Sequence, residues 1–302
     1  MFINEVLMFF ENLWEALHHA LLDTLKIALF LFLSYLLMEL FEHRSGEKSS
    51  RLIKRAGRFG PLLGGLLGAL PQCGFSAAAA GLYSGRLITR GTLIAVFLST
   101  SDEMLPIMIS GLADGSVRPM QLLSILFVKV VCGIVAGFTV DLIFFKKSSD
   151  DEHIGEICEH EGCNCKNDGI WLSSLKHTLK VSLFLLLTTF AINLAVIYIG
   201  EDRLGAAMHS VPVLGELLAA LVGLIPNCAS SVVITELYIS GTITASQLLS
   251  GLFVGAGVGL LVLFRTNRNI KENLIITAVL YACGVLLGLL VGATGLAAAV
   301  GI

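Results

Sequence analysis

Long apolar blocks constrain the fold of this chain more than any other feature. Residues 119–145 hold only two charged side chains, and residues 273–300 hold none. A helix of about 20 apolar residues crosses the hydrocarbon core of a bilayer. Charged residues make up 14% of the chain, whereas soluble domains carry about 25%. The sequence therefore predicts an all-α polytopic membrane protein.

Charge and motifs exclude several functions. The formal net charge of −3 offers no basic surface for nucleic acid. The sequence contains no GxxxxGK loop that would hold a nucleotide phosphate. We expect membrane lipid as a partner, no nucleic acid and no enzymatic activity. Any transport would use an existing gradient or a partner protein outside this chain, and the oligomeric state is left open.

The chain contains two related halves, at a shift near 155 residues. PQCGFS at 71–76 matches PNCASS at 226–231. Earlier in each half Thr24-Leu25-Lys26 matches Thr178-Leu179-Lys180, and later Cys132-Gly133 matches Cys283-Gly284. Each half is predicted to hold one long span, a segment broken at Pro-x-Cys and two further spans. The ranges are 22–42, 57–84, 91–111 and 119–145 in the first half, and 173–199, 212–239, 246–264 and 273–300 in the second.

The positions of the basic residues predict how the broken segments sit in the membrane. Each half of a broken segment is too short to cross alone. Loops 43–58 and 84–90 flank the first broken segment, and both are rich in Lys and Arg, which favour the cytoplasmic side. A re-entrant hairpin keeps both loops inside, whereas a single crossing would move 84–90 outside. Three spans and a hairpin give each half an odd number of membrane crossings, so the second half enters the membrane from the opposite side. The sequence therefore predicts two inverted-topology repeats.

These features divide the chain into four parts. Residues 1–20 are expected to form an amphipathic interfacial helix, and 21–145 the first membrane repeat. Residues 146–171 form an acidic His/Cys-rich linker, and 172–302 the second repeat. Charge placement predicts a multi-pass protein of the cell (inner) membrane with the linker in the cytoplasm. Inverted repeats in transporters place a binding site at the membrane midplane.

The two Pro-x-Cys tips are the first candidate substrate site. Proline ends the incoming half-helix, and the next half-helix begins with free amide groups. Thiols, amides and hydroxyls recur at matched positions of the two tips, which favours binding. Alternatively, cysteine packs as a small apolar residue while Ser or Asn caps a helix. The substrate-binding candidates are Cys73, Cys228, Gln72, Asn227, Ser76 and Ser231.

Charged residues inside the spans are the second candidate site. Asp102 and Glu103 lie near the middle of the predicted span 91–111. The stretch 99–103 that contains them aligns with Val254–Val258 in the matching half. An unpaired charge at that depth costs at least about 2.5 kcal/mol, so such residues are functional by default. Lys129 would neutralise one of them and leave the other for substrate or a coupling proton, with Glu236 as a further proton carrier. A structural ion pair is the alternative.

The linker is a candidate metal site of its own. Thiolate and imidazole ligands suit zinc, copper(I) and similar ions, and a reducing cytoplasm would keep the cysteines as thiols. The alternative is an acidic linker whose thiols bind nothing. The candidate ligands of this loop-bound zinc or similar ion are His153, Cys158, His160, Cys163 and Cys165.

The PQCGFS and PNCASS tips, the SDEM stretch at 101–104 and the His/Cys-rich linker together resemble the ten-transmembrane heavy-metal exporter family. Its members are also labelled arsenic efflux proteins or manganese transporters. The resemblance covers roughly residues 20–300 and implies secondary-active export of a heavy-metal or metalloid ion from the cytoplasm. The tip thiols favour a soft ion such as arsenite, zinc or cadmium, whereas the carboxylates and amides suit manganese. A carrier for a small organic solute and a membrane thiol redox protein are the alternatives.

Overall fold

The computed structural model describes residues 2–43, 59–70, 73–101, 103–144, 170–199 and 213–294. All regular structure in these ranges is helical. Pro71, Gln72 and Asp102 lie outside the described residues, as do the linker ligands His153, Cys158, His160, Cys163 and Cys165.

Six helical stretches in these ranges are long and apolar enough to cross a membrane, which confirms the predicted polytopic all-α class. Each of them overlaps one of the six predicted spans. They are Ala16–Leu37, Arg90–Ala113, Pro119–Ile143, Ser174–Leu194, Ala245–Thr266 and Ile270–Thr294.

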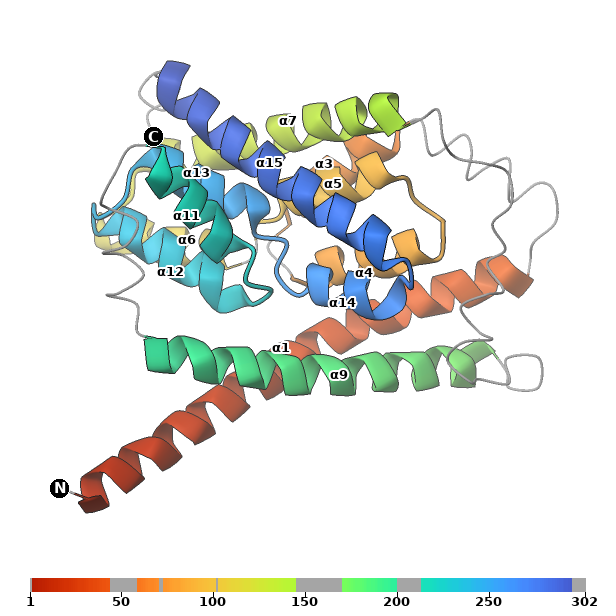
Figure 1. The fold of residues 1–302 in the computed structure, drawn as a ribbon, viewed down its shortest axis with the longest axis horizontal. Coiled ribbons are helices and arrows are strands. Elements are labelled where there is room, and N and C mark those ends of the chain that lie inside the picture. Colours follow the sequence, from red (N-terminus) through yellow and green to blue (C-terminus); the bar gives the residue numbers. More distant parts are fainter. Residues whose placement is uncertain are drawn as a thin grey trace.

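The N-terminal helix differs from its prediction. Residues 1–20 were expected to form a separate interfacial helix, but α1 (Phe2–His43) continues without a break into the first span. Its most apolar window is Ala16–Leu37, so the span begins about one and a half turns earlier than predicted. Helix α9 (Ile170–Ile199) packs along α1, and the two cross below the other helices in Figure 1.

In each half the span that follows the Pro-x-Cys segment is interrupted, which corrects the prediction of continuous helices over 91–111 and 246–264. The first broken span consists of α5 (Arg90–Ser99) and α6 (Met104–Asp114). The second consists of α13 (Ala245–Val254) and α14 (Gly259–Thr266). Pro106 explains the first break, because a proline ring clashes with the carbonyl four residues earlier. At the second break Gly257 takes a left-handed φ of 52°, which glycine adopts readily.

Each Pro-x-Cys segment also divides into two helices, as predicted. These are α3 (Gly60–Gly68) and α4 (Cys73–Ser84) in the first half, and α11 (Leu214–Gly223) and α12 (Cys228–Ile239) in the second. In each half the first of these helices packs within its own half. Helix α3 contacts α5 and α7 (Pro119–Phe144), and α11 contacts α13 and α15 (Ile270–Thr294).

Glycines allow these three-helix groups to pack closely. A Cβ at Gly223 of α11 would lie 2.2 Å from the carbonyl oxygen of Gly251 in α13. A Cβ at Gly137 of α7 would lie 2.6 Å from the carbonyl oxygen of Gly91 in α5. Backbones that approach this closely leave no room for a side chain, as small-xxx-small patterns in membrane helices allow.

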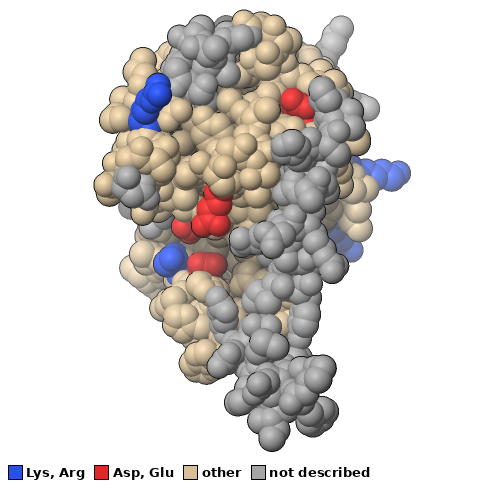
Figure 2. Space-filling view, turned by 90° about the vertical axis from the view of Figure 1, so that its left-hand side faces the viewer, with Lys and Arg blue, Asp and Glu red and all other residues tan. Residues whose placement is uncertain are grey.

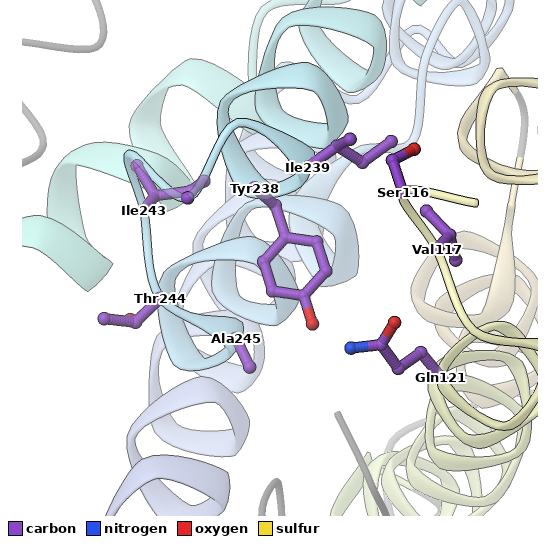
Figure 3. Close-up of a pocket in the computed structure, with 9 residues that line it drawn as sticks. Ser116, Val117, Gln121, Tyr238, Ile239, Ile243, Thr244 and Ala245 are labelled. Atoms are coloured by element: carbon purple, nitrogen blue, oxygen red, sulfur yellow. The ribbon is translucent and has the colours of Figure 1, made fainter. Parts of the chain in front are cut away.

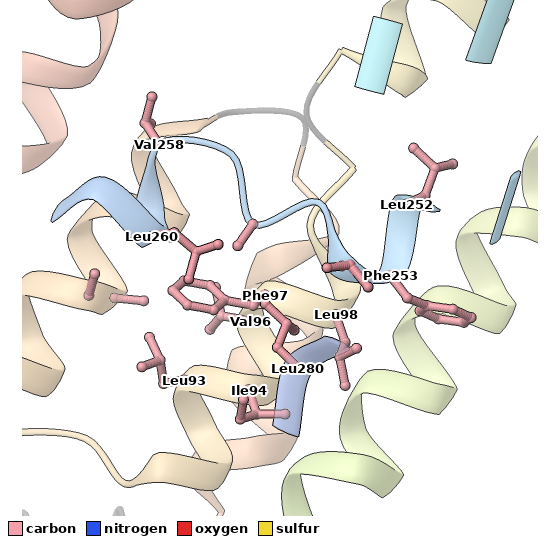
Figure 4. Packing of buried hydrophobic residues seen from close by; sticks show 14 of the residues in the cluster. Leu93, Ile94, Val96, Phe97, Leu98, Leu252, Phe253, Val258, Leu260 and Leu280 are labelled. Carbon is pink, nitrogen blue, oxygen red and sulfur yellow. The ribbon is translucent and has the colours of Figure 1, made fainter. Parts of the chain in front are cut away.

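The second helix of each broken segment packs on the opposite half as well as on its own. Helix α4 contacts α14 of the second half, and α12 contacts α6 of the first. The two contacts lie at opposite ends of the molecule in Figure 1. Between them the broken spans cross, where Phe97 and Leu98 of α5 lie in one buried cluster with Leu252, Phe253 and Leu260 of the second broken span (Figure 4).

Candidate functional site

The two breaks form the structural centre of the candidate site. The first broken span is 71% buried and the second 83%, whereas the other four spans are 33–39% buried. At the first break Ser101 is buried and donates a hydrogen bond to the carbonyl oxygen of Ala69 at 2.7 Å. Ala69 follows α3, so this bond ties the first break to the end of the helix that precedes the first Pro-x-Cys tip.

The second break brings backbone groups instead of polar side chains. The amide of Ala256 donates to the carbonyl oxygen of Val254 at 2.7 Å, which leaves the carbonyl of Leu252 without its usual helical partner. Lys129 of α7 is fully buried, and its Nζ donates to that carbonyl oxygen at 2.5 Å. The same Nζ lies 5.9 Å from the ring centroid of Phe253. A positive charge at a helix C-terminus is electrostatically favourable, so Lys129 stabilises the end of α13.

Glu103 interacts with a carboxylate that the sequence motifs did not single out. Asp23 of α1 and Glu103 repel each other electrostatically, and His19 of the same helix attracts Asp23. Lys26 Nζ lies 3.9 Å from Asp23 Oδ1. Figure 2 shows that acidic side chains gather around a hollow on the face at the left of Figure 1. Asp23 was missed because the predicted span began at residue 22, whereas the apolar window places it well inside the membrane.

The second tip is held by a chain of amides. Asn227 is buried and caps α12, with its Oδ1 accepting from the amide of Ala229 at 3.5 Å. Its Nδ2 donates to Oδ1 of Asn193 in α9, and Asn193 donates to the carbonyl oxygen of Ala16 at 3.4 Å. Asn227 therefore serves as a helix cap, as the alternative interpretation proposed, and also links the tip to α9 and α1.

The other tip residues lie on the helices that start at the two tips. Cys228 is buried, and Ser231 is buried with its Oγ donating to the carbonyl oxygen of Cys228 at 2.8 Å. Ser76 is buried against α14, where a Cβ at Gly259 would lie 2.9 Å from the Cβ of Ser76. The side chain of Cys73 lies outside the described residues, so the meeting of the two tips stays a prediction.

The remaining predicted residues are placed as follows. Glu236 is exposed on α12. The structure therefore brings Lys129 and Ser101 to the breaks, and leaves Glu236 apart from the buried groups. Among the described residues, no group of three or more His, Cys, Asp or Glu side chains is arranged to hold a metal ion.

The described residues contain six candidate spans, of which the two broken at mid-length are the most buried, and these spans define a polytopic membrane protein. The sequence over residues 12–170, more than half of the chain, matches the family described as "Putative, 10TM heavy-metal exporter". The chain belongs to this family, as the sequence motifs predicted. No curated protein and no solved structure matches the chain.

Proposed function

We propose that the protein is a secondary-active transporter that exports a heavy-metal or metalloid ion from the cytoplasm. The observation that carries this proposal is the interruption of the two most buried spans at matching positions, residues 100–103 and 255–258. Irregular backbone at membrane depth is tolerated where it is buried in protein or lines a cavity. Broken helices at the midplane are where secondary transporters bind substrate and coupling ions.

Matching backbone geometry supports two inverted repeats with re-entrant hairpins. After α4, the amides of Arg86 and Leu87 donate to the carbonyls of Tyr83 and Leu82. The residues 155 positions later, Gly241 and Thr242, repeat these bonds to Tyr238 and Leu237. The next helix of each half begins at a threonine cap, Thr89 or Thr244. The two turns lie at opposite ends of the molecule (Figure 1), as inverted copies require.

The proposed cargo site combines soft and hard ligands. Cys73 and Cys228 would supply thiolates for a soft or borderline ion such as arsenite, zinc or cadmium, while oxygen ligands would suit manganese. The electrostatic repulsion between Asp23 and Glu103 supports a cation at the first break, because a cation would relieve it. The other proposed cargo-contacting residues are Gln72, Asn227, Ser76, Ser231 and Asp102.

Coupling and sidedness complete the proposal. Lys129 would offset one acid of the Asp102–Glu103 pair, and the other acid, or Glu236, would carry a coupling proton. The linker 146–171 would lie in the cytoplasm of a cell whose inner membrane holds the protein. There His153, Cys158, His160, Cys163 and Cys165 would hold zinc or a similar ion before export.

Metal accumulation in cells tests the proposed function. A host without its own exporters, carrying the wild-type chain, should accumulate less of at least one of arsenite, zinc, cadmium and manganese. Cys228→Ser or Cys73→Ser should restore accumulation of a soft ion to the level of cells that lack the protein. Cys132→Ser is the matched control, since Cys132 lies on α7 beside the packing residue Gly133 and should leave export unchanged. Unchanged accumulation in both tip variants would contradict a thiol site.

A second experiment separates the linker from the membrane site. We expect replacement of its three cysteines and two histidines by serine to remove zinc binding by the purified protein, while the tip variants retain it. Equal zinc binding before and after the five replacements would contradict a metal site in the linker.

A further inference from the structure

One end of the molecule holds a buried ion cluster that joins the two halves. Glu272 at the start of α15 is 5% exposed, and it binds Arg86 of the turn after α4 and Arg90, the first residue of α5. Arg86 Nη1 and Nη2 donate to Oε1 and Oε2 at 3.0 and 3.1 Å. Arg90 Nη2 donates to Oε1 at 2.6 Å, and the hydroxyl of Tyr83 donates to the same oxygen. We call Tyr83, Arg86, Arg90 and Glu272 the gate cluster.

A second contact beside the gate cluster closes the same seam. Ser84 Oγ, at the end of α4, lies 2.7 Å from Thr266 Oγ1, at the end of α14. Helices α4 and α14 pack against each other across the two halves. The seam between the halves is therefore closed at this end by charge-assisted hydrogen bonds, which are stronger than neutral ones, and by a direct hydroxyl contact.

The opposite end contains the same four positions without their charges. At the shift of 155 residues Tyr83, Arg86 and Arg90 correspond to Tyr238, Gly241 and Ala245. Glu272, the third residue of α15, corresponds to the third residue of α7, which is Gln121.

These four residues line a pocket of about 270 Å³ between α12 and the α6–α7 turn. Figure 3 shows the hydroxyl of Tyr238 pointing towards Gln121, the pair that corresponds to Tyr83 and Glu272. Where one end is filled by an ion cluster, the other is hollow.

The backbone supports a specific role for Arg86. Arg86 has a φ of 59°, and its counterpart Gly241 has a φ of 75°. This left-handed conformation is strained for residues other than glycine. The second half uses glycine at the position, whereas the first half keeps an arginine there. In this strained conformation Arg86 donates two hydrogen bonds to Glu272.

We propose that the gate cluster is the gate at one end of the transport path, and that the pocket lined by Tyr238, Gly241, Ala245 and Gln121 is the open mouth at the other end. The inference deepens the proposed transporter function and rests on it. The structure then represents the state that is closed at the gate cluster and open at the pocket. By the distribution of basic loops, the closed end faces the cytoplasm and the pocket is the exit. Transport requires the Glu272 ion pairs to break and re-form in each cycle.

A reversible cross-link across the seam tests the gate during transport. The double variant Ser84→Cys and Thr266→Cys places two thiols where the hydroxyls lie 2.7 Å apart. The matched control is Ser240→Cys and Thr242→Cys, whose hydroxyls lie 2.9 Å apart within one turn beside the pocket. Oxidation should stop efflux of arsenite or zinc from loaded cells by the first variant, and a reductant should restore it. The control should transport equally in both states, because its cross-link joins no two elements that must separate.

A labelling experiment needs no cargo and therefore tests the gate separately from the proposed function. The thiol of a Thr266→Cys variant is labelled with a maleimide in the purified full-length protein, with the parent protein as the background. Adding Glu272→Gln should speed labelling by about tenfold, as expected when a minor open state becomes populated. Tyr83→Phe, which keeps both ion pairs, serves as a milder opening variant if Glu272→Gln does not fold.

The outcomes separate the two proposals. Faster labelling without transport of any tested metal would uphold the gate and count against metal export. Unchanged labelling in both opening variants, or full transport by the oxidised Ser84→Cys and Thr266→Cys variant, would overturn the gate.

Discussion

Replacing Glu272 with Gln should destabilise the protein by an amount that follows from its contacts. The variant removes the carboxylate that Arg86 and Arg90 both bind and leaves two guanidinium groups facing a neutral amide. Removing one partner of a buried ion pair costs about 3–5 kcal/mol. The side chains of Arg86 and Arg90 are 30% and 37% exposed, so water compensates part of the loss. We therefore expect a loss of about 2–3 kcal/mol, below the fully buried range.

Thermal unfolding of the purified protein in detergent measures this loss. At about 2–4 °C per kcal/mol, Glu272→Gln should lower the apparent Tm by about 4–12 °C. Tyr83→Phe removes the hydrogen bond donated to Glu272 and the one accepted from Arg90 Nε but keeps both ion pairs, so its cost should be about 1–2 kcal/mol. Glu236→Gln is the control, because this carboxyl is exposed. A fall for Glu272→Gln no larger than that for Tyr83→Phe would refute the reasoning that the carboxylate holds the cluster together.

Two further predictions concern helix packing and capping. Gly223→Ala should lower the free energy of unfolding by about 1–3 kcal/mol, and with it the apparent Tm, because its Cβ would lie 2.2 Å from the backbone oxygen of Gly251. Gly255→Ala, whose Cβ would meet nothing closer than 3.5 Å, should not. Asp141→Asn should cost about 0.5–2 kcal/mol in chemical or thermal unfolding, since the carboxylate accepts from the amide of Gly91 at 2.7 Å at the start of α5. An unchanged Tm for Gly223→Ala would contradict the close contact with Gly251. An unchanged Tm for Asp141→Asn would contradict the hydrogen bond from Gly91.

The sequence predicted the membrane class and the positions of the spans, because the bilayer imposes a length and an apolar composition that are visible in one dimension. The division at Pro-x-Cys was predicted for a local reason, since proline cannot continue a helix. The close packing of α7 on α5 at Gly133 and Gly137, where a Cβ would lie within 3.0 Å of Ala95 or Gly91, depends on contacts between distant parts of the chain.

The breaks in the spans that follow the Pro-x-Cys segments were missed although the signal was present. Pro106 lies within a stretch of continuously high hydropathy. Because hydropathy is averaged over many residues, it does not reveal a local loss of hydrogen bonding. Asp23 was missed because a boundary error of a few residues moved it from the membrane to its edge. Its neighbour Glu103 lies 80 residues further along the chain, and no periodicity connects them.

The gate cluster was also beyond the sequence analysis. Arg86 and Arg90 were interpreted only as basic residues that mark the cytoplasmic side. Their bond to Glu272, which lies more than 180 residues away, depends on α4 packing on the opposite half. The matched positions could have drawn attention to this difference, since arginine at 86 and 90 becomes glycine at 241 and alanine at 245.

The packing of α4 of the first half on α14 of the second half has a consequence for biosynthesis. Helix α4 ends at Ser84, and its partner α14 begins at Gly259, 175 residues later. At about 5–20 residues per second, a ribosome needs about 9–35 s to make that interval. During this time the face of α4 that α14 will cover has no native neighbour, and the arginines beside it await their carboxylate. Until α14 is made, this face of the first half contacts the insertion machinery or lipid. We expect a quality-control protease to recognise the chain at this stage.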